Sequence, residues 1–312
     1  MSGTGRLVVG VDGGGTKTDV VLADLDGTEM AACQTTGTNH ESLGAERVVT
    51  TIDEAVRSLL HQVGAEPADV AMSAYGLAGI DWPSDVQMMR SALQGLGLGG
   101  HMVVVNDSEV ALRAGCTRPW GVVSSVGTGT VTAGVNRDGR RFRTMAVGWG
   151  EPSGSWSMVA QALEAVAAAY HGTGPQTALT GILLQAFGHS TVPELFEALT
   201  RGRAVIGAGH APLLDEAVAE GDAVATEVLT GLARRHADMV GAVARHLLME
   251  HEEFELVMSG GVHVANGPFG SRFRERVAEH CPHATPVLLA VPPVHGAVRL
   301  ALDALAGEAV AG

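Results

Sequence analysis

The sequence predicts an α/β protein built from two similar units, and three observations point to this fold. Strands joined as hairpins open the chain, and they are followed by strands that alternate with helices. A second set of hairpin strands begins near Gly121 and is followed by another helical region. A glycine-rich loop joins the first two strands in each set. Strands that alternate with helices are typical of α/β domains.

The first unit reads as three hairpin strands followed by two strands and two helices. We expect strands at residues 6–11, 18–23 and 29–35, the last two joined at Asp26-Gly27, a strong hairpin signal. After a polar loop at 37–40, apolar residues at helical spacing predict a helix that ends near residue 63. Next come a strand at 70–75, a helix at 84–96 with Ser84 as its N-cap, and an apolar strand at 102–105.

The second half repeats part of this plan. Its expected strands are 121–126, 131–135, 141–147, 256–258 and 287–290, and its expected helices are 155–170, 176–187, 192–199, 223–249 and a terminal helix at 294–306. We therefore predict two domains, residues 1–115 and 116–312. The sequence leaves open whether the terminal helix packs on the first domain.

Composition restricts the classes of protein. The 312 residues carry a formal net charge of −14, which argues against binding of nucleic acid. Cys33, Cys116 and Cys281 lie far apart and suggest neither a disulfide framework nor a zinc site. No signal peptide or membrane-length apolar run is evident, so we expect a soluble cytoplasmic protein that does not bind membranes.

The first glycine loop predicts a phosphate site. Glycine N–H groups can converge on an anion, and hydroxyl and ammonium groups add donors. The candidate residues are Asp12, Gly13, Gly14, Gly15, Thr16, Lys17 and Thr18. Asp12 could also hold a hydrated Mg²⁺ beside the phosphates. The alternative is a hairpin without a ligand, whereas a P-loop is disfavoured because Thr16 separates Gly15 from Lys17.

Two further glycine segments follow apolar strands. Gly127, Thr128, Gly129 and Thr130 form a possible second phosphate loop. Ser259, Gly260 and Gly261 would let the backbone approach a flat ligand such as adenine. An ordinary strand-to-helix turn is the alternative for this last segment.

Asp107 is the candidate catalytic residue. It follows an apolar strand and opens a helix, and ligand sites in α/β sheets collect at the carboxyl ends of strands. A carboxylate there is placed to act as a general base on a substrate hydroxyl. Its alternative role is that of an N-cap.

Candidate sugar contacts lie in two loops. Trp149, between Gly148 and Gly150, could stack on a sugar face or serve as a core aromatic residue. Asn39 and His40 could bond sugar hydroxyls or cap the next helix.

These segments together resemble the BadF/BadG/BcrA/BcrD ATPase-like family, in particular its N-acetylglucosamine kinase branch, within the sugar kinase, Hsp70 and actin superfold. The matching segments are VGVDGGGTKTDVVLAD, GTNHESLG, YGLAGID, VVVNDSEVALRAG, SSVGTGTVTAGV, VGWG, VMSGGV and PPVHGAVRLAL. The resemblance implies two ribonuclease-H-like domains with a cleft between them, which closes on ATP-Mg²⁺ and an amino sugar. It also implies a homodimer.

The resemblance assigns roles to individual residues. Asp107 takes the proton of the sugar 6-hydroxyl, the two glycine loops hold phosphates, and Asp12 positions Mg²⁺ through water. Gly260 and Gly261 face the adenosine. The expected sugar-side residues are Asn39, His40, Gly79, Asp107, Trp149, Gly150 and Glu151.

One segment departs from the family pattern. The family usually continues after GWG with a spacer and GDEGS, whereas this chain reads GWGEPSGSWS. The acidic pair is missing, and Glu151 is the candidate substitute, which leaves the identity of the sugar open. Two alternatives follow. One is an ATPase activator of a dehydratase, which would bridge a dimer with an iron-sulfur cluster; Cys116 is the candidate ligand, but the sequence offers no partner cysteine for it. The other is a non-catalytic sugar or nucleotide sensor.

Overall fold

The computed structural model describes residues 7–264 and 267–311, and its first half forms a five-stranded mixed sheet. The strands are β1 (Leu7–Gly13), β2 (Lys17–Asp24), β3 (Glu29–Thr36), β4 (Val70–Leu77) and β5 (His101–Asn106). Their order is β3-β2-β1-β4-β5. The first three strands are antiparallel, and β4 and β5 continue the sheet in parallel with β1.

The second sheet repeats this topology. Its strands are β6 (Gly121–Val126), β7 (Thr130–Val135), β8 (Arg141–Arg143), β9 (Phe254–Ser259) and β10 (Ala284–Leu288). Their order is β10-β9-β6-β7-β8, with antiparallel β7 and β8 on one side of β6 and parallel β9 and β10 on the other. The predicted α/β fold with two similar sheet units is confirmed.

Helices cover both sheets. The first half contains α1 (His40–Leu43), α2 (Ala45–Val63), α3 (Pro83–Leu93) and α4 (Asp107–Gly115), with short 3-10 turns at Pro67–Asp69 and Gln94–Leu96. The second contains α5 (Ser155–His171), α6 (Leu179–Phe187), α7 (Val192–Thr200), a 3-10 turn at Ala208–His210, α8 (Pro212–Ala219), α9 (Ala223–His246), α10 (Gly261–Val264), α11 (Pro268–His280) and α12 (Val294–Ala311). None of the helices in the described ranges combines the length and apolar content needed to cross a membrane.

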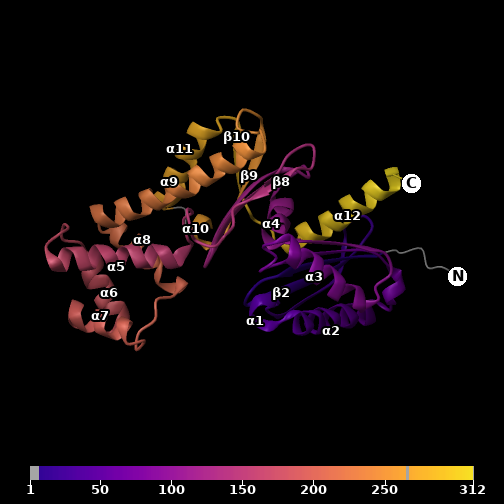
Figure 1. Cartoon of the computed structure of the whole chain (residues 1–312), viewed down its shortest axis with the longest axis horizontal. Helices are drawn as coiled ribbons and strands as arrows, with labels where there is room; N and C mark the ends of the chain where they lie inside the picture. The colour runs from indigo at the N-terminus through magenta and orange to yellow at the C-terminus, as the bar shows by residue number, and fades with distance from the viewer. Residues whose placement is uncertain (1–6, 265–266, 312) are drawn as a thin grey trace.

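The first sheet is buried on both faces, which explains the continuous apolar run of β1. Val9 belongs to a core with Ile52 of α2, whereas Val8 belongs to a separate core with Val298 of α12. A Cβ at Gly10 would lie 2.7 Å from the backbone nitrogen of Val298, so glycine allows α12 to approach closely. The terminal helix therefore returns to the first sheet, where Figure 1 shows it beside the indigo strands.

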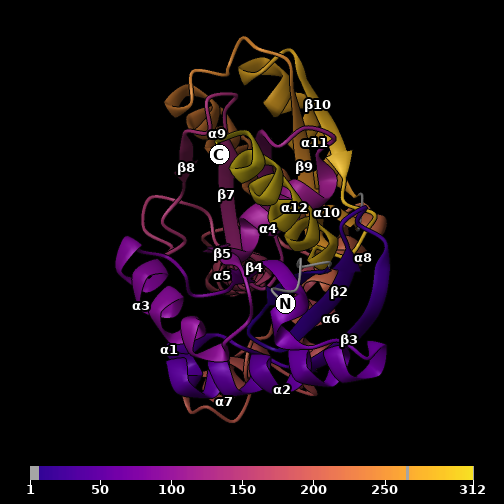
Figure 2. The same ribbon diagram turned by 90° about the vertical axis from the view of Figure 1, so that its right-hand side faces the viewer.

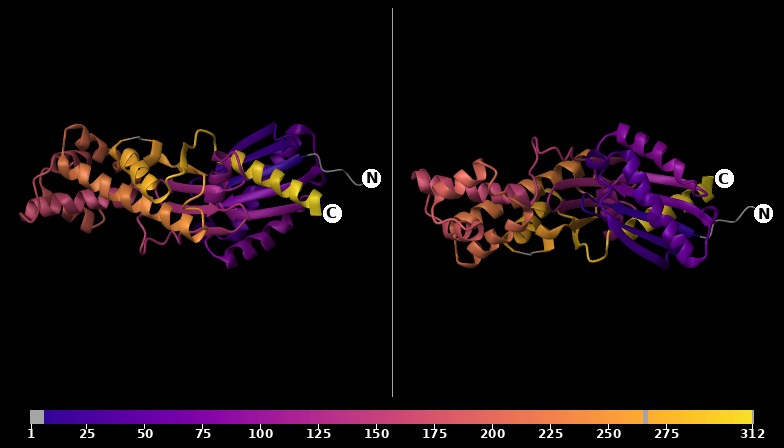
Figure 3. Two further views of the ribbon diagram at one scale, coloured as in Figure 1. Left: turned by 90° about the horizontal axis from the view of Figure 1, so that it is seen from above. Right: turned by 90° about the horizontal axis from the view of Figure 1, so that it is seen from below.

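The molecule is elongated. Helices α5 to α8 lie at the end opposite the first sheet (Figures 1 and 3). The large core of the second half joins α5 and α9 to the apolar residues of β6 and β9. Viewed from the end that carries the first sheet, α12 crosses α4 (Figure 2), and the two helices pack directly against each other. This crossing lies close to where the chain passes between its two halves.

Local expectations failed where caps and left-handed residues decide the boundaries. Ser84 is not an N-cap, because α3 begins at Pro83 and its N-cap is Trp82. The carboxylate of Asp85 accepts a 2.8 Å hydrogen bond from the N–H of Trp82 and so closes the first turn. Proline suits this position because the N–H that it lacks would have no partner there.

The strand predicted at residues 141–147 is shorter than expected. It ends at Arg143, and Ala146 (φ 59°) and Gly148 (φ 78°) adopt left-handed conformations that a strand cannot accommodate. β10 begins three residues earlier than predicted, α6 begins at Leu179 instead of residue 176, and α9 ends at His246 instead of residue 249. Helices α1, α8, α10 and α11 were not anticipated.

Candidate active site

A cleft of about 530 Å³ collects residues from both halves of the chain. From the first half it is lined by Asp12, Gly14, Gly15, Thr16, Ala78, Gly79, Asp81, Asn106, Asp107, Ser108 and Ala111. From the second half it is lined by Ser125, Gly127, Thr128, Gly129, Thr130, Val131, Arg143, Ala146, Ser259 and Pro293. The hairpin loops β1–β2 and β6–β7 therefore contribute to one cavity, as two phosphate-binding loops would have to.

Both loops leave backbone groups free to face the cavity. Each is closed by a 2.9 Å hydrogen bond, from Gly14 N to Lys17 O in the first loop and from Gly127 N to Gly129 O in the second. A Cβ built at Gly15, Gly127 or Gly129 would meet no atom within 4 Å, so these positions border open space. Backbone N–H groups in such a loop can approach an anion without obstruction by side chains.

Gly154 supports the second loop from behind. A Cβ at this position would lie 2.4 Å from the carbonyl oxygens of Gly127 and Gly129 and 2.6 Å from that of Thr128. The next residue, Ser155, donates a 2.8 Å backbone hydrogen bond to Gly127 O. The segment that follows the GWG motif thus fixes the shape of the second loop.

Asp107 faces the cleft as the first residue of α4. The N-cap of this helix is Asn106, whose side-chain oxygen accepts a 3.1 Å hydrogen bond from Ser108 N. Burial, with a contribution from the nearby charge of Asp81, raises the pKa of Asp107 to about 6, and hydrogen bonding to the Ser108 backbone and the Arg143 charge limit the rise. The capping role that the sequence suggested for Asp107 is filled by Asn106.

Asp12 lies at the end of β1 and lines the same cleft. Burial, together with the charges of Asp107 and Asp19, raises its pKa to about 7, and the charge of Lys17 limits the rise. A buried carboxylate whose ionised form is disfavoured by a second carboxylate is an environment that a bound cation would relieve. The site therefore fits a Mg²⁺ ion that keeps most of its water and takes one carboxylate from the protein. Within the described residues there is no cluster of three or more His, Cys, Asp or Glu side chains of the kind that would cage a metal.

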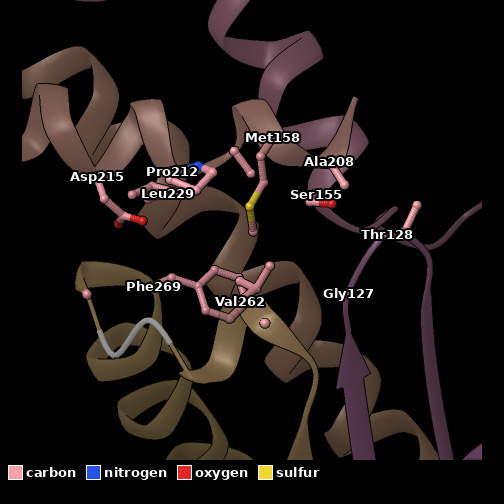
Figure 4. A pocket seen from close by; sticks show the side chains of 13 residues that line it. Gly127, Thr128, Ser155, Met158, Ala208, Pro212, Asp215, Leu229, Val262 and Phe269 are labelled. Atoms are coloured by element: carbon pink, nitrogen blue, oxygen red, sulfur yellow. The ribbon is translucent and has the colours of Figure 1, made fainter. Parts of the chain in front are cut away.

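An apolar pocket of about 340 Å³ adjoins the cleft and shares Gly127 and Thr128 with it (Figure 4). Figure 4 shows Met158 and Phe269 on opposite walls and Asp215 at one end. Its lining residues are Gly127, Thr128, Ser155, Met158, Ala208, Ala211, Pro212, Asp215, Leu229, Gly261, Val262, Gly267 and Phe269. A flat apolar group with a polar edge, such as a purine, suits these walls.

The third glycine segment divides between the two cavities. Ser259 lines the cleft and Gly261 lines the apolar pocket. Gly260 has φ 94°, and a Cβ there would lie 2.3 Å from the carbonyl oxygen of Val126. Only glycine permits this approach of β9 to the start of the second loop.

Three residues of the first loop lie outside the cleft lining. The side chain of Lys17 is 60% exposed and donates a 2.8 Å hydrogen bond to Asp19. Thr18 is buried, and its hydroxyl lies 2.8 Å from that of Thr38. Gly13 packs against Thr38, whose hydroxyl would be 2.2 Å from an added Cβ. In this conformation these residues shape the hairpin but do not face the cavity.

The predicted sugar-side residues are dispersed. Gly79 lines the cleft with φ 82°, and Asn39 lies directly behind it, 2.7 Å from where a Cβ would be. Asn39 caps α1 through a 2.9 Å hydrogen bond from Glu41 N. His40 approaches Asp85 at 3.9 Å, and its buried Nδ1 has no hydrogen-bond partner in the described part of the chain.

The GWG segment presents its tryptophan to solvent. Trp149 is 83% exposed, between Gly148 and Gly150, which both have positive φ. Glu151 is buried and accepts backbone hydrogen bonds from Val147 N (2.7 Å) and Gly148 N (3.1 Å). Trp149, Gly150 and Glu151 are absent from the cleft lining of the described residues.

Sequence reasoning missed Asp81 and Arg143 as residues of the cleft. Arg143 Nη1 donates a 2.9 Å hydrogen bond to Asp81 Oδ1, joining β8 to the loop after β4. Asp81 lies within the segment YGLAGID, which offered a signal, but an arginine on an edge strand normally indicates a solvated position.

The sequence model of the BadF/BadG/BcrA/BcrD ATPase family matches residues 9–301. The chain belongs to this family. The expected family is thus confirmed.

Individual relatives are similar over most of the chain. An N-acetyl-D-glucosamine kinase of Dictyostelium discoideum is 28% identical, covering 96% of this chain and 98% of its own. An N-acetylmuramic acid/N-acetylglucosamine kinase of Clostridium acetobutylicum is 27% identical, with coverages of 82% and 85%. The crystal structure of a candidate N-acetylglucosamine kinase from Chromobacterium violaceum has a similar fold, with a TM-score of 0.68, 22% identity and coverages of 95% and 99%.

Proposed function

We propose that this protein is an ATP-dependent kinase that phosphorylates the 6-hydroxyl of an amino sugar, N-acetylglucosamine or glucosamine. The observation that carries the proposal is the position of Asp107 in the same cleft as both glycine loops. The similarity to N-acetylglucosamine kinases supports the class of sugar. The fold by itself would not, because one fold hosts many functions.

Asp107 is the proposed general base. Its carboxylate accepts the proton of the sugar 6-hydroxyl while that oxygen bonds to the γ-phosphorus, and the bond from the γ-phosphorus to the bridging oxygen of ADP breaks. With a pKa of about 6, the group is ionised at neutral pH yet more basic than an ordinary aspartate. Most of the rate enhancement would come from positioning and from charge stabilisation.

ATP would span the two adjoining cavities. The purine would occupy the apolar pocket, and the phosphates would pass Gly127 and Thr128, the residues that both cavities share, to reach the first loop. Asp12 would hold Mg²⁺ through water, and the ion, when bound, neutralises phosphate charge. Thr16 and Thr130 add hydroxyl donors at the two loops.

We also propose that the chain divides into two domains near residue 115, residues 1–115 and 116–312. The terminal helix α12 is the exception: it belongs with the first domain because it packs on β1 and β4. The family resemblance further suggests a cytoplasmic homodimer, and sedimentation of the purified protein tests the oligomeric state.

An ATPase activator with an iron-sulfur cluster receives less support. Cys116 is 1% exposed, and burial raises its pKa to about 12, with the charge of Glu255 adding to the rise and that of Arg113 opposing it. A thiol in this environment is a poor cluster ligand, because ligation requires the thiolate. A non-catalytic sensor remains the other alternative, since the family's acidic pair is missing after GWG.

ADP release with ATP-Mg²⁺ and a panel of hexoses and amino sugars tests the proposal. Turnover with one amino sugar well above a sugar-free control would support it. ADP release that is independent of sugar would support an ATPase instead, and no release with any sugar would support a sensor.

A further inference from the structure

The short strand β8 carries two arginines that reach across to the first half of the molecule. Arg141 Nε lies 2.9 Å from Glu109 Oε2 on α4. Arg143 Nη1 lies 2.9 Å from Asp81 Oδ1, and its Nη2 also donates to the backbone oxygen of Asp81. Residues two apart on a strand share one face, so both arginines point to the same side of β8.

The two ion pairs differ in burial. The side chains of Arg143 and Asp81 are 18% and 22% exposed, whereas that of Arg141 is 57% exposed. Exposed pairs contribute little, but removing one partner of a largely buried pair leaves an uncompensated charge. The Arg143 pair is therefore the stronger link between β8 and the first half. Both of its residues also line the cleft.

A continuous set of hydrogen bonds leads from this pair to the first turn of α4, which carries the proposed base. Asn106 Nδ2 donates to Asp81 Oδ1 at 3.3 Å and to Ile80 O at 3.2 Å. Asn106 Oδ1 accepts from the backbone N–H of Ser108 at 3.1 Å and from its hydroxyl at 2.5 Å. Because Asn106 is the N-cap immediately before Asp107, its orientation fixes the start of α4 and with it the base.

We propose that Arg143 is a positioning residue, which couples the relative placement of the two sheets to the orientation of Asp107 through Asp81 and Asn106. This proposal rests on the proposed function, because it assumes that Asp107 is the general base. Closing the cleft would bring Arg143 to Asp81, and opening it would separate them. The base would then be correctly placed only when both halves enclose the substrates.

The charges around Asp107 fit this arrangement. Arg143 on β8 lowers its pKa, whereas burial and Asp81, in the loop after β4, raise it. Asp12 on β1 also faces Asp107, since the charge of Asp107 raises the pKa of Asp12. Glu109, on the same helix as Asp107, is paired with Arg141. Loss of Arg143 removes a positive charge that favours the ionised form of Asp107.

The test compares Arg143→Met with Arg140→Met, a matched change at an exposed arginine on the turn before β8. We expect Arg143→Met to lower kcat about tenfold or more, with the KM for ATP changed less than about twofold, because the chain leads to the base and not to the nucleotide pocket. The acidic limb of its pH–rate profile should move to higher pH. Arg140→Met should match the wild type in each measurement.

Arg143→Lys separates charge from geometry. Lysine keeps a positive charge but lacks the planar fork that donates to two oxygens of Asp81. We expect its pH profile to return towards that of the wild type while kcat stays lowered, and Arg143→Lys decides the question if Arg143→Met does not fold.

A double-mutant cycle with Asp81→Asn gives a readout that does not depend on kinase activity. Thermal unfolding should show that the effects of Arg143→Met and Asp81→Asn are not additive, as expected for groups in contact. An active wild type whose kcat and pH profile are unchanged by Arg143→Met, or additive unfolding effects, would overturn the inference and leave the proposed function intact. A wild type without sugar-dependent turnover would overturn both.

Discussion

Glu151 Oε1 lies 2.7 Å from the backbone nitrogen of Val147, so a buried carboxylate closes the loop that carries Trp149. The same oxygen accepts a second backbone hydrogen bond from Gly148. In this conformation Glu151 faces its own loop instead of the cleft. Its expected place among the sugar contacts therefore becomes an indirect one, in which it holds the loop that bears the candidate sugar-stacking residue.

Glu151→Ala should weaken sugar binding. Without this acceptor the loop loses the hydrogen bonds to the backbone N–H groups of Val147 and of Gly148, which has a positive φ. We expect the KM for the sugar to rise about fivefold or more, because the loop that carries Trp149 would hold the sugar less well in both the ground state and the transition state. The KM for ATP should stay within about twofold. Glu151→Gln keeps an acceptor oxygen and is the control. Equal sugar KM values for the wild type and Glu151→Ala would refute this role.

Asp12→Asn should stabilise the protein and inactivate it. The folded-state pKa of Asp12, about 7, exceeds its usual 3.8, so the folded chain holds this proton more tightly than the unfolded chain. Its contribution to stability is favourable at low pH and is lost as the pH rises from about 4 to 7. At pH 8 we expect Asp12→Asn to melt at least about 2 °C above the wild type, and at pH 4 the difference should vanish.

Asp26→Asn, at an exposed turn position, is the control for that experiment. Its melting temperature should follow that of the wild type at both pH values. A melting temperature for Asp12→Asn that is lower than the wild type at pH 8 would show that the carboxylate is not destabilising there.

The pH dependence of the reaction should reflect both cleft carboxylates. Asp107 must lose its proton to act as a base, and burial raises its pKa to about 6, while that of Asp12 lies at about 7. We therefore expect kcat/KM to rise with pH between about 5 and 7 and to level off near pH 8, as a property of the coupled pair. A rate that is already at its plateau at pH 5 would contradict this environment for Asp107.

Gly154→Ala should damage ATP binding without contacting ATP. Its Cβ would lie 2.4 Å from the carbonyl oxygens of Gly127 and Gly129, which forces the second loop to move. We expect the KM for ATP to rise about tenfold or more, because the N–H groups of that loop would be displaced. Gly181→Ala on α6, where a Cβ meets no atom within 4 Å, is the control. An unchanged KM for ATP in Gly154→Ala would mean that the loop tolerates displacement.

The fold was largely predictable, because the strands and glycine loops are local features. Apolar strands that end in Asp12 and Asn106-Asp107 place two carboxylates at the carboxyl ends of β1 and β5, parallel strands with β4 between them, and the structure brings both into one cleft. The α1, α8 and α10 helices escaped prediction because each has eight residues or fewer. The α11 helix was missed although its apolar residues Phe269, Phe273 and Val277 recur at a helical spacing of four.

Contacts between distant residues were not predictable. Arg143 and Asp81 are 62 residues apart, and no local pattern indicates that an edge strand of the second sheet reaches the loop after β4. The pairing of Lys17 with Asp19 could have been predicted, because residues two apart on a strand share a face. The expectation of a phosphate ligand overlooked this nearer partner.

Phosphorylation of N-acetylglucosamine by the wild type and by Asp107→Asn, followed by ³¹P NMR of the product, tests the central claim most directly. We expect the wild type to form a 6-phosphate, and Asp107→Asn to lose about 100-fold or more in kcat while binding ATP with near-normal affinity. Asp53→Asn, on α2 and outside the lining of the cleft, should remain active. Retained sugar phosphorylation by Asp107→Asn would contradict the assignment of Asp107 as the general base.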